Sequence, residues 1–280
     1  MKLDLCLVSC DLNPNYYPYF PLVKECWKTI VGIDCILILV ANEIPYELMP
    51  EKDSIILFPP IKEIPTAFQA QCIRLLYPCI LAKTYHGIII SDMDIIPLSR
   101  DYFMKSIQEL PEDTFCVYRD VISEYRQYPM CYCAGSSAVW SVLFPVRIMN
   151  DLRECLRRWY NKDDYVISSP YSEMWAQDQT QLYISVNENC NNVKTVLMRD
   201  EATGYKRLDR LDINFIYENI DEIKKGIING EYTDFHLPRP YHVHKVLLNE
   251  LLSGVLCLFK LQEVRLERYQ DPSCGVSGQV

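Results

Sequence analysis

The sequence predicts an α/β layered fold in which a mostly parallel central sheet is flanked by helices. Two observations predict it. Over the first hundred residues, short apolar runs alternate with longer segments whose apolar residues recur at helical spacing, an order typical of this class. The run at 35–40 is also too continuous to leave a solvated face, and such strands belong to parallel sheets that are covered on both sides.

The first half of the chain supplies four expected strands and two expected helices. Strands are expected at 3–9, 34–41, 54–58 and 87–90, because each is an apolar run that ends in polar residues or proline. Helices are expected at 21–31 and 66–82, and Thr66 is the expected N-cap of the second one. Strand and helix therefore alternate up to residue 90.

The second half continues the pattern less regularly. Helices are expected at 102–110, 146–160 and 175–186, and strands at 114–118, 193–198 and 138–140. The final helix, at 245–268, has a wide apolar face that can pack on the domain, on a second copy in a homodimer, or on a membrane surface. We expect one domain over residues 1–270, followed by a disordered tail at 271–280.

Composition narrows the classes of partner. The chain has 280 residues and a formal net charge of −9, so binding to duplex nucleic acid is not expected. No stretch reaches the roughly 18 apolar residues that cross a bilayer. The opening residues 1–11 are typical of a strand and not of a signal peptide, so a cytosolic location with reduced thiols is expected. Among 13 cysteines, Cys131 and Cys133 are either half of a zinc site or small core residues.

The most informative motif follows the fourth expected strand. Asp92 and Asp94 form the only Asp-x-Asp in the chain, directly after the apolar run at 87–90. Two carboxylates at the end of a buried strand repel each other, and a divalent cation relieves that repulsion. The alternative interpretation is a turn with an Asx cap; the buried strand before the motif favours a metal site.

At these residues the chain resembles a known family. The segments 66–78 (TAFQAQCIRLLYP) and 87–98 (GIIISDMDIIPL) are similar to the core of GT-A fold glycosyltransferases, and in particular to glycogenin-like enzymes. The segment 9–17 (SCDLNPNYY) resembles the small GT-A domains of large algal DNA viruses that glycosylate capsids. The resemblance covers residues 3–100. It implies a GT-A (Rossmann-like) fold with a nucleotide-binding half at 1–100, a sugar and acceptor half at 101–245 and a C-terminal helix at 246–270.

The resemblance implies a function and its ligands. The expected activity moves a hexose from a nucleoside-diphosphate sugar, expected to be a UDP-sugar, to a glycan or a protein-linked acceptor. Mn²⁺, or Mg²⁺ in its place, would hold the diphosphate. Retention of configuration is favoured over inversion, because glycogenin-like relatives lean that way. If the protein is viral, the expected location is the host cytoplasm and the expected acceptor a capsid glycan.

The resemblance also implies roles for residues in the first half of the site. Asp94 would bind the metal directly, and Asp92 would touch the metal shell or the ribose. The nucleotide pocket would be lined by Ser9 and Asp11, and the base would stack on Tyr16 or Tyr17.

Three further positions have an expected role, and one of them, Arg74, also has a structural alternative. Arg74 would reach the donor, or it would tie its helix to the sheet by a salt bridge. Gly135 would lie in a turn of small residues that faces the sugar. Lys245 would neutralise a phosphate.

Two later clusters complete the expected site. The family closes its metal shell with a late histidine, and three candidates lie together: His236, His242 and His244. In an extended segment His242 and His244 point the same way, so we rank these two first. Asp178 and Glu173 are the candidates for an acidic group beside the transferred sugar, acting as a general base or orienting hydroxyl groups. The alternative for both is a solvated helix start.

Two other functions fit parts of the pattern. Phosphatases of the haloacid-dehalogenase type also carry Asp-x-Asp after an apolar strand, but they place it on the first core strand and follow it with Thr or Val where this chain has Ile96. A non-catalytic sugar-nucleotide-binding subunit would keep the fold and tolerate loss of the acidic pair, which this chain retains.

Overall fold

The computed structural model describes residues 1–160 and 176–270, with side chains as far as Phe259. Its main sheet has seven strands in the order β3-β2-β1-β4-β7-β6-β8. Only β7 runs antiparallel to its neighbours, β4 and β6; the other pairs are parallel. The strands are β1 (Leu5–Asp11), β2 (Asp34–Val40), β3 (Ile55–Phe58), β4 (Gly87–Ile90), β6 (Thr114–Val117), β7 (Cys133–Ser136) and β8 (Lys194–Leu197).

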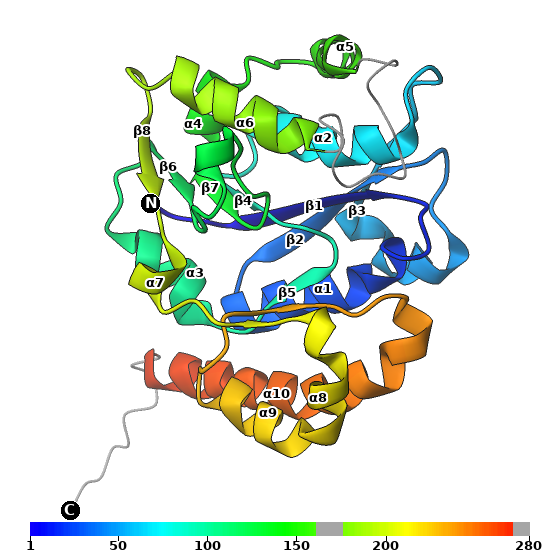
Figure 1. Ribbon diagram of the computed structural model, residues 1–280, viewed down its shortest axis with the longest axis vertical. Coiled ribbons are helices and arrows are strands. Elements are labelled where there is room, and N and C mark those ends of the chain that lie inside the picture. Colours follow the sequence, from blue (N-terminus) through cyan, green and yellow to red (C-terminus); the bar gives the residue numbers. More distant parts are fainter. Residues whose placement is uncertain (161–175, 271–280) are drawn as a thin grey trace, which may run out of the picture.

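Helices cover both faces of this sheet (Figure 1). One face carries α2 (Thr66–Ile80), α4 (Ser137–Leu143), α5 (Met149–Trp159) and α6 (Gln177–Glu188); the other carries α1 (Phe20–Cys26), its continuation η2 (Trp27–Val31) and α3 (Arg100–Gln108). Strand β1 shows why both are needed, because Leu5 and Leu7 enter one core while Cys6 and Val8 enter the other. The expected α/β fold with a mostly parallel sheet is confirmed.

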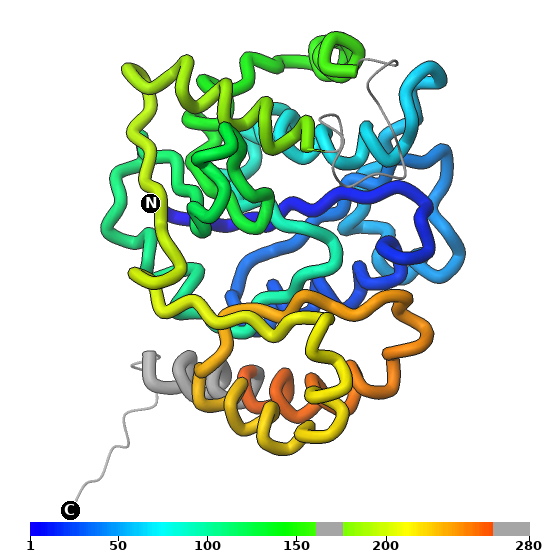
Figure 2. The backbone as a smooth tube through the Cα atoms, viewed as in Figure 1, coloured from blue at the N-terminus to red at the C-terminus, as the bar shows by residue number. Residues whose placement is uncertain are grey.

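A third layer lies beneath, formed mainly by the yellow-to-orange part of the chain in Figure 2 and completed by a short strand from its first half. Its three-stranded sheet has the order β5-β10-β9, with β5 (Ile95–Pro97), β9 (Arg207–Leu208) and β10 (Asp234–His236). The helices of this layer are α8 (Ile213–Glu218), α9 (Ile220–Ile228) and α10 (Tyr241–Gln270); α7 (Asp200–Thr203) precedes the layer in the chain. Short η turns occur at η1 (Tyr17–Tyr19), η3 (Tyr46–Ser54), η4 (Ser123–Tyr125) and η5 (Arg210–Asp212).

A buried carboxylate ties this layer to the body of the molecule. Asp234 has no exposed surface and accepts hydrogen bonds from the hydroxyls of Tyr132, at 2.7 Å, and Tyr205, at 2.8 Å. Arg207 donates to it from two nitrogens at 2.9 and 2.8 Å. Because Tyr132 directly precedes β7, this network links the small sheet to the large one.

Two local expectations were wrong. Residues 138–140 belong to α4 and not to a strand: the strand ends at Ser136, whose hydroxyl accepts from the backbone N–H of Val139 and so caps the helix. The segment that holds His242 and His244 is also not extended, because α10 begins at Tyr241.

Helix α10 bears on the expectation that the chain has no membrane-crossing stretch. By length and composition alone, Tyr241–Phe259 could cross a bilayer. Part of its apolar surface is buried against the rest of the chain, through Leu247, Leu248, Leu251, Leu252 and Val255, whereas Val243, Val246 and Leu258 are exposed. A core helix passes the same test of composition, so this observation is weak support for a membrane span.

Candidate active site

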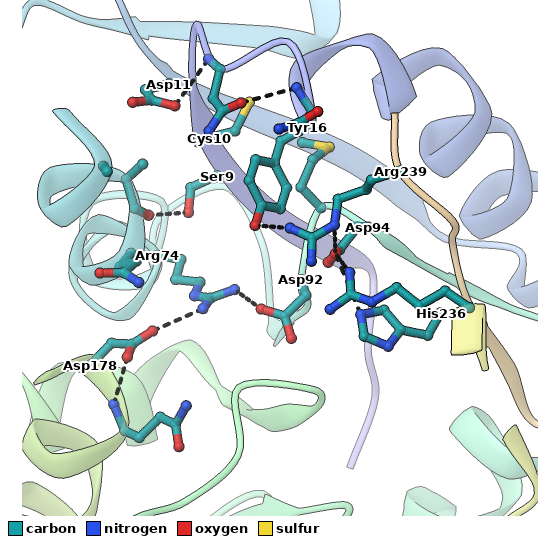
Figure 3. A pocket seen from close by; sticks show the side chains of 18 residues that line it. Ser9, Cys10, Asp11, Tyr16, Arg74, Asp92, Asp94, Asp178, His236 and Arg239 are labelled. Atoms are coloured by element: carbon teal, nitrogen blue, oxygen red, sulfur yellow. Dashed lines mark hydrogen bonds and ion pairs between the residues drawn. The ribbon is translucent and has the colours of Figure 1, made fainter. Parts of the chain in front are cut away.

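A cleft of about 590 Å³ lies beyond the carboxyl ends of β1 and β4. In the sheet, β2 and β3 lie on one side of β1 and β4 lies on its other side, so the direction in which strands are added reverses between β1 and β4. Ligands of open α/β sheets bind at such a switch point. Figure 3 shows the side chains that converge on it. The lining residues are Ser9, Cys10, Asp11, Asn13, Asn15, Tyr16, Ala67, Ala70, Gln71, Arg74, Asp92, Met93, Asp94, Asp178, Gln179, Arg210, His236 and Arg239.

One wall of the cleft comes from the end of β1 and the loop after it. Ser9 is buried and its hydroxyl donates to the carbonyl of Ala70 on α2. Asp11 accepts from the Thr66 hydroxyl at 2.8 Å and from the backbone N–H of Asn13 at 3.1 Å. Tyr16 is half-buried, and its ring lies under the Arg239 guanidinium, 4.9 Å from the ring centroid. The structure thus brings the three residues expected to line a nucleotide pocket to one wall.

A second group is built around Arg74 on α2. Its guanidinium donates to Asp92 at 2.5 Å and to Asp178 at 2.8 Å, so that two carboxylates flank one cation (Figure 3). Burial would lower the pKa of Arg74, but the two carboxylates outweigh it and raise that pKa. For Asp178 burial acts in the opposite direction and raises the pKa, and Arg74 offsets part of that rise. Both interpretations of Arg74 are compatible with this placement, since it ties α2 to the other elements and lines the cleft.

A third group surrounds Asp94. Its Oδ2 atom lies 2.8 Å from Arg210 Nη1, 3.4 Å from His236 Nε2 and 3.7 Å from Arg239 Nε. Burial would raise the pKa of Asp94, but the hydrogen bond from His236 and the charges of Arg239 and Arg210 outweigh it and hold that pKa below its usual value. Asp94 is therefore an ionised carboxylate inside a cationic cluster.

The small sheet explains how distant residues reach Asp94. Strand β5 follows the acidic pair immediately, and β10 pairs with it antiparallel in a register that sets His236 opposite Ile95. The backbone N–H of Leu237 also donates to the Asp94 carbonyl at 2.8 Å. Strand β9 pairs with β10 and leads into Arg210. Two- and three-residue strands carry no periodic signal, so this arrangement could not be found in the sequence.

Several expected site residues lie elsewhere. Gly135 is buried in β7, where a Cβ atom would lie 3.1 Å from Val139 and 3.2 Å from Phe115, so its role there is close packing. His242 and Lys245 are exposed on α10, and His244 lies 3.5 Å from the Tyr217 hydroxyl; none of these three lines the cleft. The structure brings His236 to the acidic pair in their place. Glu173 lies outside the described residues.

Two charged cleft residues, Arg210 and Arg239, had no role predicted from the sequence. Arg239 follows His236 by three residues, so proximity to the expected histidine was a usable signal. Arg210 lies in an irregular polar segment with no motif, and only the pairing of β9 with β10 shows its position.

The donor set at the acidic pair does not fit a divalent cation. Each carboxylate already faces guanidinium: Asp92 faces Arg74, and Asp94 faces Arg210 and Arg239. A divalent ion here would have to compete with three guanidinium groups for the carboxylates of Asp92, Asp94 and Asp178. Within the described ranges 1–160 and 176–270, no group of three or more His, Cys, Asp or Glu side chains is arranged to hold a metal ion. Mn²⁺ or Mg²⁺ therefore stays a prediction of the resemblance, without support from these side chains.

Comparison with known proteins adds the following. No family model matches the sequence. The chain is 27% identical over 82 residues to a probable chorismate pyruvate-lyase of Vibrio vulnificus (strain CMCP6), an alignment that covers 29% of this chain and 46% of that protein. An alignment of under half the relative's length does not establish an activity.

The solved structures that resemble this one include two glycosyltransferases. The apo form of GlyE from Streptococcus pneumoniae TIGR4 aligns with a TM-score of 0.49 and 12% identity, over 94% of this chain and 64% of that chain. A glycosyltransferase involved in the glycosylation of the major capsid of PBCV-1 aligns with a TM-score of 0.41 and 8% identity, over 83% of this chain and 93% of that chain. The chain thus spans 64% of the length of GlyE.

Proposed function

We propose that this protein is a glycosyltransferase that moves a sugar from a nucleoside-diphosphate sugar to a hydroxyl group of a glycan or a protein-linked acceptor. One observation carries the proposal: three kinds of side chain line the cleft at the switch point of the sheet. They are the aromatic ring of Tyr16, the guanidinium groups of Arg210 and Arg239, and the carboxylates of Asp92 and Asp178. These suit, in that order, the nucleoside, the diphosphate and the sugar of one extended donor.

The three groups supply complementary chemistry. Tyr16 offers an aromatic face beside the β1 loop, where a base can stack. Arg210 and Arg239 present guanidinium donors, which match phosphate oxygens bidentately. Asp92 and Asp178, held by Arg74, present carboxylate oxygens that accept from sugar hydroxyls.

The reaction requires stabilisation of a leaving group. The bond from the anomeric carbon to the β-phosphate oxygen breaks, and its electron pair stays on the diphosphate. The acceptor oxygen bonds to the anomeric carbon and passes its proton to the departing diphosphate oxygen or to water. Cations fixed beside the diphosphate stabilise the developing charge, which is greater in the transition state than in the bound donor.

Of the two roles expected for Asp178, the contacts favour orientation. Its Oδ2 accepts from Arg74 at 2.8 Å and its Oδ1 from the backbone N–H of Gln179 at 2.9 Å. Both oxygens are thus held in place, which suits a group that fixes the position of a sugar hydroxyl. UDP as the nucleotide, a hexose as the sugar, retention of configuration and the acceptor stay predictions of the resemblance.

The test is a ligand and activity panel on the full chain. We expect one or more nucleoside-diphosphate sugars to raise the melting temperature, by the equivalent of about 2.7 kcal/mol at 100 times the dissociation constant. We also expect release of the nucleoside diphosphate when acceptor glycans are added. Arg157→Gln, on α5 and outside the cleft, is the matched control and should behave as the wild type.

Other results would point to the rival functions. Stabilisation by fluoroberyllate with Mg²⁺, and none by nucleotide sugars, would indicate a phosphatase. Stabilisation by a nucleotide sugar without transfer to any acceptor or to water would indicate a binding subunit.

A further inference from the structure

We propose that Arg210 and Arg239 bind the donor diphosphate directly, where the resemblance expects a divalent cation, and that Asp94 is a positioning residue for these arginines. The inference rests on the proposed function, because it names the groups that hold the donor.

The charge around Asp94 favours an anion over a metal. One carboxylate faces two guanidinium groups, at 2.8 Å and 3.7 Å, and the His236 imidazole at 3.4 Å. The Asp209 carboxylate lies 3.3 Å from the other ring nitrogen of His236, so Asp94 and Asp209 together balance the charges of the two arginines. The guanidinium groups stay protonated and line the cleft, where they attract a diphosphate and repel a divalent cation.

The two arginines also have donors to spare. Each guanidinium carries five N–H donors. Within the described residues, Arg210 directs one nitrogen to Asp94, and Arg239 directs one to the Tyr16 hydroxyl and another towards Asp94. Their side chains are 26% and 29% exposed and line the cleft, so the remaining donors can reach a ligand.

Arg74 shows the contrasting arrangement in the same cleft. Its side chain is only 9% exposed, and Asp92 and Asp178 balance its charge with one carboxylate to spare. Arg74, Asp92 and Asp178 are thus already paired with one another, and together they carry a net negative charge. The two arginines with donors left over line the Asp94 end of the cleft, so a diphosphate should bind there.

The position of Arg239 agrees with the orientation of an extended donor. Its guanidinium lies over the Tyr16 ring and binds the Tyr16 hydroxyl, and Figure 3 shows both side chains beside Asp94 and His236. A diphosphate held there continues directly from a nucleoside on the β1 wall. Its other end faces Asp92, which leads to the Arg74 group.

The experiment measures binding of two probes, inorganic pyrophosphate and UDP, to the full chain by calorimetry, in EDTA and again with MnCl₂. We expect both probes to bind in EDTA, and MnCl₂ to change the UDP affinity by less than about threefold. Arg210→Gln and Arg239→Gln should each weaken binding in EDTA by about tenfold or more, since each removes a charge-assisted hydrogen-bonding group. Arg157→Gln should leave both affinities unchanged.

The outcomes separate this inference from the proposed function. UDP binding that occurs only with Mn²⁺, or that survives both arginine substitutions in EDTA, would overturn the inference and leave the glycosyltransferase proposal intact. Failure of UDP and of every other nucleoside diphosphate to bind, with or without metal, would overturn both. If a glutamine variant does not fold, the wild-type affinities for UDP in EDTA and in MnCl₂ still decide whether binding needs the metal. Arg210→Lys keeps the positive charge but loses the bidentate geometry. It should therefore weaken UDP binding by a smaller factor than Arg239→Gln.

Discussion

At the scale of single residues, the cleft is a set of paired charges. Asp94 and Asp178 are both buried carboxylates, yet their pKa values move in opposite directions. Burial is the largest cause for each. The cations around Asp94 outweigh it, whereas Arg74 alone does not outweigh it for Asp178, which also lies near Asp92. The neighbours therefore decide the direction: His236, together with Arg239 and Arg210, lowers the pKa of Asp94, whereas Asp178 has Arg74 alone against burial and Asp92.

Asp94 should make stability depend on pH. Because its pKa in the folded protein lies below the usual 3.8, its contribution is complete above that value and is lost as the pH falls through the folded pKa. Asp94→Asn should lower the free energy of unfolding at pH 7 by about 1–3 kcal/mol. Urea melts from pH 7 down to pH 3 should show the difference from wild type shrinking at the acid end. A constant difference over that range would contradict this account.

Arg74 should be more costly to remove alone than to remove together with a partner. Arg74→Met leaves Asp178 buried without its cation, and breaking such a pair should cost about 3–5 kcal/mol. In the double variant Arg74→Met, Asp178→Asn, we expect part of that loss to be recovered, because the remaining buried group is neutral. Urea denaturation of the two single variants and the double variant gives the coupling energy; strictly additive losses would argue against a paired role.

At the scale of elements, long apolar runs were found from the sequence and very short strands were not. Strands β1 to β4 and helix α2 lie within a few residues of their expected positions, because each strand is a mostly apolar run and the apolar residues of α2 recur at helical spacing. Strands β5, β9 and β10 have two or three residues each, and only their mutual pairing defines them. The expectation of a strand at 138–140 failed because the Ser136 cap, a local polar contact, decided for a helix.

Strand β4 depends on a glycine at its start. A Cβ atom on Gly87 would lie 2.0 Å from the backbone carbonyl oxygen of Lys2, which cannot move aside as a flexible side chain could. Gly87→Ala should therefore lower the free energy of unfolding by about 1–3 kcal/mol. The control is Gly254, inside α10, where an added Cβ atom would meet no other atom within 4 Å: Gly254→Ala should stabilise by up to about 1 kcal/mol. Thermal melts of both variants check the difference in sign.

At the scale of the whole molecule, the site is assembled from both ends of the chain. Sequence reasoning named the β1 loop, Arg74, the acidic pair and Asp178 as candidates, and the structure brings all of them to one cleft. It could not place Arg210 and Arg239, since their position follows from the third layer folding beneath the sheet. The late histidine was expected, but the wrong assumption of an extended segment ranked His242 and His244 above His236.

The third layer is held to the rest of the protein in part by the buried side chains of α10. Leu248 is fully buried, and Leu248→Ala should cost about 2–5 kcal/mol of unfolding free energy. Val246, on the same helix, is 78% exposed, and Val246→Ala should change stability by less than about 0.5 kcal/mol. Denaturation of the protein without detergent measures both. Equal effects of the two substitutions would show that α10 does not pack in this way.

The pairing of β5 with β10 means that a ligand in the cleft would slow local opening of the small sheet. Residues on this small sheet and on the loop after β1 meet at the cleft, from opposite ends of the chain. A molecule bound between them acts as a removable cross-link, and opening of the small sheet would then require its release. Amide hydrogen exchange in β9 and β10 should therefore slow when a ligand binds, although neither strand provides most of the contacts to it. This protection would report that the cleft is occupied without an assay of sugar transfer.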